Sequence, residues 1–147
     1  MLFRIRPAAD DIAALGALKF KASLAWGDHV AEITALPEAR RFRADHLDFA
    51  FVAEDADRIV GFAALLPAKG RRAELEDLFV DPALWRRGIG RLLIAEAERR
   101  ARSRGARSIH VIANGRAQGF YSRCGFELIG EVATCFGPAP EMEKRLD

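Results

Sequence analysis

The chain has 147 residues, of which half are hydrophobic and 30% charged, and it carries a net charge of +2 at neutral pH. That length and balance fit one globular domain over residues 1–147. The sequence contains no apolar run near the ~20 residues of a membrane span and no signal-peptide pattern at its start. Its two cysteines lack the spacing of metal ligands. We therefore expect a cytoplasmic protein that binds no metal and no membrane.

Arginines gather in local clusters, and the largest cluster lies between Arg99 and Arg107. It lies at the end of a predicted helix, and Gly105 supplies a helix stop. Cations near a helix C-terminus complement the helix dipole. Because no helix-turn-helix or aromatic-rich pattern accompanies these arginines, we expect a solvated helix end and no nucleic-acid partner.

The first third of the chain is predicted to be mostly helical. Alternation over residues 2–6 predicts a strand that Pro7 ends. Asp10 and Asp11 then begin a helix that runs to about residue 26. Shorter helical segments are expected over 30–36 and 38–47.

The rest of the chain is expected to alternate between strands and helices. A hairpin is predicted from 48–54 and 59–66, then a loop over 67–72, a central strand over 73–80 and a helix over 89–104 with Leu92, Leu93, Ala95 and Ala97 inward. We then expect a strand over 108–113, a short helix over 117–123, a strand over 126–134, a loop at Gly137-Pro138 and a strand over 142–146. The class is α+β, with a mixed, mostly antiparallel sheet of six to seven strands and about four helices.

The segment from Val80 to Arg91 predicts a strand, a glycine-spaced turn and a helix start. The first backbone N–H groups of a helix have no partner inside it, and the helix dipole adds positive potential there. Gly88 and Gly90 allow a ligand to approach the backbone, and charge is added by Arg86, Arg87 and Arg91. A phosphate or pyrophosphate suits such a turn. The alternative is an ordinary loop before an arginine-rich helix.

A second motif lies about thirty residues further on. It contains Asn114, Ala117, the pair Phe120-Tyr121 and then Gly125-Phe126. With the Val-Asp-Pro and Arg-Gly-Ile-Gly elements before it, this pattern resembles the GNAT superfamily of acyl-CoA-dependent N-acetyltransferases. The likeness covers residues 59–130 well, and the whole chain in element order. It implies an acetyl-CoA site, direct acetyl transfer to an amine and a sheet splayed between its fourth and fifth strands.

The resemblance assigns the cofactor site residue by residue. It implies that the pantetheine arm pairs with backbone near Leu78, Phe79 and Val80. The pyrophosphate would lie on the turn formed by Arg86, Arg87, Gly88, Ile89, Gly90 and Arg91, with further contacts from Asn114, Ala117 and Phe120. The sequence departs from the family where Trp85 replaces the usual Gln or Arg, and Arg86 offers the charge one place later. Asn114 also fits a plain Asn-Gly turn.

The resemblance also implies catalytic roles. Tyr121 matches the general acid that protonates the departing CoA thiolate, whereas an aromatic pair can equally belong to the core. Glu74 and Glu76 lie on one face of the predicted strand and are candidate bases, with Glu76 ranked first. The alternative is that they only line the acceptor pocket. For Cys124 we expect packing rather than covalent catalysis.

The acceptor site is expected to include Trp26 and His29. Acidic candidates nearby (Asp28, Glu32, Glu74 and Glu76) favour a cationic small molecule. The predicted function is therefore an acetyl-CoA-dependent N-acetyltransferase that acts through a ternary complex on a primary amine, with small molecules favoured over proteins. The alternative is a catalytically silent CoA-binding regulatory domain, and a homodimer is compatible with the resemblance.

Overall fold

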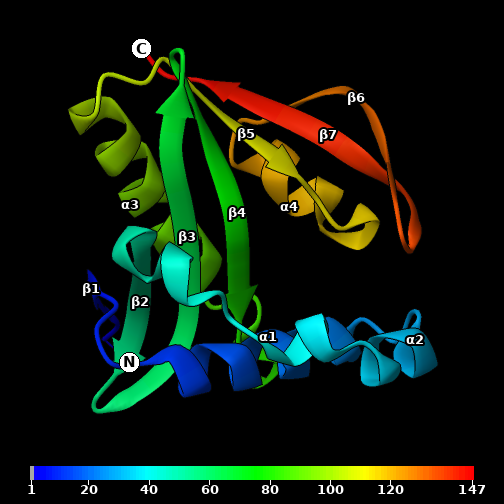
Figure 1. Ribbon diagram of the computed structural model, residues 1–147. Coiled ribbons are helices and arrows are strands. Elements are labelled where there is room, and N and C mark those ends of the chain that lie inside the picture. The colour runs from blue at the N-terminus through cyan, green and yellow to red at the C-terminus, as the bar shows by residue number, and fades with distance from the viewer. Residues whose placement is uncertain (1) are drawn as a thin grey trace. The chain divides into compact units, whose positions relative to one another are not determined.

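A computed structural model describes residues 2–147 and contains a seven-stranded sheet in the order β1-β2-β3-β4-β5-β7-β6 (Figure 1). The strands are β1 (Arg4–Pro7), β2 (Ala50–Asp55), β3 (Arg58–Lys69), β4 (Arg72–Val80), β5 (Ser108–Ile112), β6 (Glu127–Thr134) and β7 (Gly137–Arg145). The β4–β5 pair is parallel, and its ladder joins Arg72–Glu74 to Ser108–His110. The mixed sheet confirms the predicted α+β class.

In the part of the chain that the structure describes, four α-helices and four 3-10 helices accompany the sheet. The α-helices are α1 (Ile12–Ala25), α2 (Val30–Ala35), α3 (Ile89–Ser103) and α4 (Gln118–Arg123). The 3-10 helices are η1 (Pro37–Arg40), η2 (Ala44–Phe49), η3 (Pro82–Leu84) and η4 (Gly115–Ala117). Within residues 2–147, none of the helices has the length and apolar character needed to cross a membrane.

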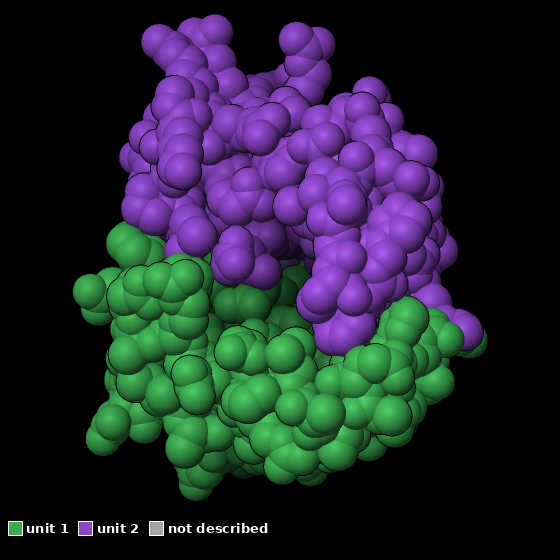
Figure 2. Space-filling view, turned by 45° about the vertical axis from the view of Figure 1, so that its right-hand side comes forward, with its two compact units in different colours: residues 1–64, 77–93 green, residues 65–76, 94–147 purple. Residues whose placement is uncertain are grey.

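The chain divides into two compact units, coloured separately in Figure 2. Unit 1 comprises residues 1–64 and 77–93, and unit 2 comprises residues 65–76 and 94–147. The first part of β4 belongs to unit 2 and its end belongs to unit 1. The prediction of one domain over the whole chain stays a prediction.

The core of unit 1 forms where α1 meets β2 and β3. Leu15 and Leu18 of α1 are buried with Val52 of β2 and Phe62 of β3. Phe42 meets Phe62 edge to face, with 5.7 Å between the ring centroids. Burial of such large side chains removes apolar surface from water and holds these elements together.

In unit 2, one face of the sheet carries the helices. Met142 of β7 and Val111 of β5 occupy paired positions and are both buried. Lys144 of β7 donates hydrogen bonds to Glu98 of α3 (3.1 Å) and to the Cys124 carbonyl after α4 (2.6 Å). Because side chains alternate along a strand, Glu141, the residue before Met142, lies on the opposite face.

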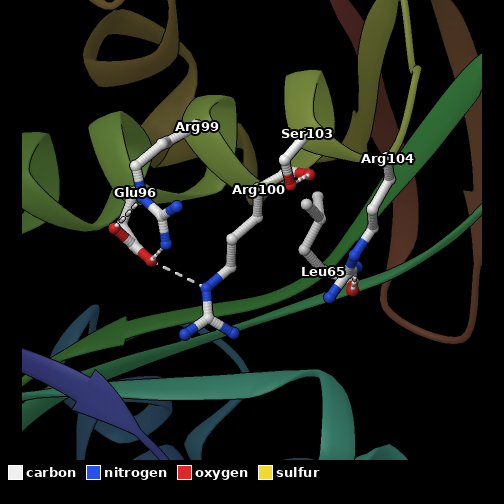
Figure 3. Close-up of polar contacts among 6 residues, drawn as sticks. All are labelled: Leu65, Glu96, Arg99, Arg100, Ser103 and Arg104. Carbon is white, nitrogen blue, oxygen red and sulfur yellow. Dashed lines mark hydrogen bonds and ion pairs between the residues drawn. The ribbon is translucent and has the colours of Figure 1, made fainter.

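The arginines near the end of α3 are largely held in contacts (Figure 3). Glu96 accepts hydrogen bonds from Arg99 and Arg100, and the Arg104 guanidinium donates to the Leu65 carbonyl at 3.1 Å. Burial lowers the pKa of Arg104, although a guanidinium stays charged at neutral pH. The predicted solvated helix end is right for Arg99 and wrong for Arg100, which is mostly buried.

Several element boundaries differ from those predicted, and the single helical segment expected over 38–47 is the two separate 3-10 helices η1 and η2. Three further differences concern the strands, and two of these involve proline. The strand β3 continues to Lys69 through Pro67, whereas a loop was expected. Pro67 lies beyond Ala64, where the ladder with β2 ends, so its missing N–H breaks no bond to β2. Likewise β7 begins at Gly137 instead of residue 142, because Pro138 and Pro140 precede the segment from Glu141 that pairs with β5. At the third boundary, η2 continues to Phe49 where a strand was expected.

The buried face of α3 also differs from the prediction. Leu93 and Ala97 are buried as expected, but Leu92 and Ala95 are exposed. The buried side instead follows Ile89, Leu93, Ile94, Ala97 and Ala101. Positions four residues apart share a helix face, so Ile89, Leu93, Ala97 and Ala101 form one buried stripe. Leu92 precedes Leu93 by one position and therefore lies outside that stripe.

Candidate functional site

Asp81 fixes the chain where β4 ends. Its side chain is nearly fully buried, and its carboxylate accepts a hydrogen bond from the Ala83 N–H at 3.0 Å. Lys21 (3.2 Å) and Arg58 form ion pairs with the same carboxylate. Burial alone would raise the pKa of Asp81, but the Ala83 hydrogen bond and the two cations lower it below the ordinary value. The start of the turn is therefore held by three contacts.

The turn that follows has the geometry of an anion cradle. Arg86 and Gly88 both adopt positive φ, at +67° and +86°. The helix α3 then begins at Ile89, and the Leu92 N–H bonds the Gly88 carbonyl at 3.1 Å. The Ile89 and Gly90 N–H groups precede that first turn. A Cβ on Gly88 would meet open space, so the backbone is accessible where the sequence predicts a pyrophosphate.

Trp85 has a structural role in place of the family's polar residue. Its indole N–H donates to the Val80 carbonyl at 2.9 Å, and its ring lies 4.5 Å from that of Trp26. The Val80 carbonyl, expected to face pantetheine, thus already has a donor. Phe79 likewise contacts Phe62 of the unit 1 core, with 5.6 Å between the ring centroids. Trp26 and Trp85 together connect the end of α1 to the end of β4.

His29 lies on the surface immediately before α2. It adopts a left-handed conformation with φ of +54°, and its Nδ1 is 3.0 Å from a Glu32 carboxylate oxygen. Its ring is about half exposed. The predicted role in acceptor binding stays a prediction.

Asn114 and Tyr121 lie in unit 2 on either side of η4. The Asn114 Oδ1 accepts the Arg116 N–H at 2.8 Å, so this side chain does cap the turn that its sequence favours. Tyr121 is buried between Phe120 and Phe126, with ring centroids 5.2 and 5.4 Å away in edge-to-face geometry. Ala117 ends η4. Core packing of Tyr121 therefore accompanies any role as an acid.

A histidine that the sequence analysis did not single out lies beside Glu74. His110 of β5 is buried, with its Nδ1 2.7 Å from Glu74 Oε1 and its Nε2 2.6 Å from Glu141 Oε2. Burial raises the pKa of Glu74, and the hydrogen bond from His110 opposes that rise. Glu76, ranked first from the sequence, is exposed.

One signal in the sequence could have indicated His110. It is an ionisable residue flanked by apolar residues in the strand Ser108-Ile-His-Val-Ile. Buried polar groups are almost always hydrogen-bonded, so such a histidine requires partners on neighbouring strands. Which strands are its neighbours depends on the parallel β4–β5 pairing, and that pairing cannot be read locally.

The predicted residues therefore fall into two groups. Unit 1 holds the turn and the end of β4, together with Trp26 and His29. Unit 2 holds Glu74, Glu76, Asn114, Ala117, Phe120 and Tyr121, to which the structure adds His110 and Glu141. The first group contains a turn suited to a phosphate, and the second contains ionisable side chains of the kind that can exchange protons.

Comparison with known proteins identifies the family. The profile of the Acetyltransferase (GNAT) family matches residues 19–126, well over half of the chain. The chain therefore belongs to this family of acetyltransferases.

Two curated relatives match parts of the chain. One is a mycothiol acetyltransferase from Rhodococcus jostii (strain RHA1), 53% identical over 45 residues, which are 31% of this chain and 15% of that protein. The other is glucosamine 6-phosphate N-acetyltransferase 1 from Oryza sativa subsp. japonica, 35% identical over 91 residues, 56% of this chain and 54% of that enzyme. The chain thus spans about half of the rice enzyme and much less of the bacterial protein.

A solved structure supports the fold. PaiA N-acetyltransferase from Thermoplasma acidophilum, in complex with coenzyme A, matches with a TM-score of 0.74 and 22% identity over 99% of each chain. This likeness confirms the fold, and the bound coenzyme A is a property of that neighbour.

Proposed function

We propose that this protein transfers an acetyl group from acetyl-CoA directly to a primary amine, preferably on a small molecule. The observation that carries the proposal is the β4–α3 turn, where Arg86 and Gly88 adopt positive φ just before a long helix. That backbone conformation brings consecutive N–H groups toward one anion. The family membership makes the pyrophosphate of acetyl-CoA the natural anion.

Residues of unit 1 would hold the cofactor. The Ile89 and Gly90 N–H groups bind the pyrophosphate, and the exposed Arg86, Arg87 and Arg91 add positive charge. The buried Asp81 carboxylate holds the start of the turn in place. Acetyl-CoA supplies the acetyl group as a thioester, whose carbonyl an amine can attack.

Residues of unit 2 would move the protons. An amine must be neutral to attack, so we assign Glu74 as the group that takes its proton, directly or through water. Its raised pKa and its contact with His110 favour it over the exposed Glu76. We assign the Tyr121 hydroxyl as the proton donor to the departing sulfur. Asn114, whose carbonyl oxygen is used in the turn, keeps an amide N–H₂ for the pantetheine arm.

Calorimetric titration tests the cofactor half of this proposal. The protein is titrated with acetyl-CoA, with desulfo-CoA and with ATP. We expect micromolar binding of acetyl-CoA and of desulfo-CoA, since the cradle contacts the pyrophosphate and not the sulfur, and no binding of ATP. The matched variant Arg86→Gly keeps the left-handed backbone but removes the guanidinium, and it should weaken acetyl-CoA about tenfold, or ~1.4 kcal/mol.

The outcomes separate the candidate functions. Failure of both CoA compounds to bind would overturn the cradle. Equal binding of ATP would mean that the turn is a general phosphate site. Tight acetyl-CoA binding with no thiol release for any amine would favour a silent CoA-binding domain.

A further inference from the structure

We propose that His110 is a positioning residue, held doubly protonated between Glu74 and Glu141, that keeps Glu74 ionised and oriented to receive the proton of the acceptor amine. This inference rests on the proposed function, because it assumes that Glu74 is the base. It adds two residues, His110 and Glu141, to the machinery of the reaction. All three residues belong to unit 2.

The two short contacts of His110 define its protonation. Its Nδ1 lies 2.7 Å from Glu74 Oε1 and its Nε2 lies 2.6 Å from Glu141 Oε2. A carboxylate oxygen accepts and cannot donate unless it is protonated, so a ring nitrogen without a proton would oppose it lone pair to lone pair. When both carboxylates are ionised, both ring nitrogens must therefore donate. The imidazolium offsets one of the two negative charges beside it.

The positions of all three side chains are set by the sheet. Glu74 pairs with His110 in the parallel β4–β5 ladder, and His110 and Glu141 lie on the same side of adjacent strands. Gly130 of β6 pairs with Glu141, and a Cβ at Gly130 would come 3.1 Å from Glu141 Oε1. The glycine leaves room for this carboxylate. Four strands thus build one cluster.

Burial and the neighbouring imidazolium have opposite effects on the ionisation of Glu74. Burial favours the protonated form of a carboxyl group, and a protonated Glu74 could take nothing from an amine. The imidazolium favours the ionised form of Glu74. Among the described residues, Glu74 Oε1 has His110 as its hydrogen-bond partner and Oε2 has none, so Oε2 is available to the amine. In the step itself, one amine N–H bond breaks and one O–H bond forms at Oε2.

Other charged side chains lie on the strands around Glu74, His110 and Glu141. Arg72 and Glu76 lie on β4, and Arg72 contacts Glu143 at 3.7 Å. Glu143 pairs with His110 across the β5–β7 ladder, and Arg145 pairs with Ser108. The charged groups to consider are Arg72, Glu76, Glu143 and Arg145. Within residues 2–147, the two nitrogens of the imidazole are used by Glu74 and Glu141, and none of these four groups hydrogen-bonds it.

The first test needs no activity. Nitrogen-15 NMR of the histidine side chains of the ligand-free protein at pH 7 should show both nitrogens of His110 protonated. The chain has three histidines, so His29 and His46 serve as internal references. One unprotonated His110 nitrogen at pH 7 would overturn the proposal, whether or not the protein binds acetyl-CoA.

The second test is the pH dependence of kcat/KM. Activity should rise as Glu74 ionises, and loss of the neighbouring cation in His110→Gln should move that acid limb to higher pH by about one unit or more. Glu141→Gln keeps an oxygen acceptor for the imidazole and should give a smaller shift in the same direction. His46→Gln is the control and should leave the limb in place. Folded His110→Gln and Glu141→Gln variants with the wild-type limb would contradict the positioning role, while Glu74→Gln separately tests the base itself.

Discussion

At the residue scale, Asp81 shows how one buried carboxylate can fix a functional turn. It is held by a backbone N–H of η3 and by cations from α1 and from β3, all within unit 1. Its own N–H bonds the Val60 carbonyl at 2.8 Å. The exit of the chain from β4 therefore depends on side chains far away in the sequence. Loss of this charge should therefore change the stability of the fold more than the rate of the reaction.

We predict that Asp81→Asn lowers the free energy of unfolding at pH 7 by about 1–3 kcal/mol. Because the folded-state pKa of Asp81 is lowered, its stabilising contribution is complete above the ordinary value of 3.8 and is lost as pH falls through the lower folded value. The difference between variant and wild type should therefore shrink as the solution is acidified below about pH 4. Urea unfolding at several pH values measures this difference.

The matched control is Asp45→Asn. Asp45 pairs with Arg43 at 2.6 Å, but both side chains are exposed. Exposed ion pairs contribute little to stability, so this variant should unfold at the wild-type midpoint. Equal effects of the two substitutions would mean that the burial of Asp81 does not matter.

At the element scale, a glycine determines how closely α1 approaches η1. Gly16 is buried in the middle of α1, and a Cβ there would lie 2.4 Å from the Arg40 carbonyl oxygen. Backbone cannot move aside as a side-chain tip can. The helix gains little from glycine itself, which has a poor helix propensity. The glycine is therefore explained by packing within unit 1.

We predict that Gly16→Ala destabilises the protein by about 1–3 kcal/mol, because the clash outweighs the better helix propensity. The matched control is Gly119→Ala in α4, where the nearest atom is a terminal nitrogen of Arg123 at 3.2 Å. That flexible guanidinium can move, so alanine there should be neutral or stabilising by up to ~1 kcal/mol. Thermal unfolding of both variants distinguishes them, and a stable Gly16→Ala protein would show that η1 shifts freely.

The element scale also shows where sequence reasoning succeeded. The order from Val80 through the turn to α3 was predictable because Asp-Pro, spaced glycines and an amphipathic run are all local signals. The continuation of β3 past Pro67 and the early start of β7 were not. A proline usually ends a strand, and it is tolerated here only because of which neighbouring strand pairs at that position.

At the scale of the whole molecule, the part of the candidate site that the sequence did not predict depends on pairing between strands far apart in the chain. From their positions on one strand, Glu74 and Glu76 are both candidate bases, and the sequence ranks Glu76 first. Only the pairing of β4 with β5, and of β5 with β7, brings His110 and Glu141 to Glu74. These contacts join residues more than thirty positions apart, and no local pattern encodes them. The family motifs were predictable, whereas the buried charge cluster was not.

The predicted site residues are divided between two compact units. The residues proposed to bind the pyrophosphate lie in unit 1, and those proposed to transfer protons lie in unit 2. A substitution in one group should therefore leave the other group's measurable property unchanged. Asp81 and Arg86 variants should alter stability or cofactor affinity, and His110 variants should alter the pH profile.

The most direct test of the account is acetyl transfer itself. The protein is mixed with acetyl-CoA and a panel of primary amines, thiol release is followed, and the masses of amine and protein are measured. We expect thiol release only with an amine present, an amine heavier by one acetyl group and an unmodified protein. Tyr121→Phe should lower kcat at least tenfold, about 1.4 kcal/mol, with acetyl-CoA affinity unchanged. An acetylated protein, or thiol release without amine acetylation, would contradict direct transfer, and an unchanged kcat would remove Tyr121 from it.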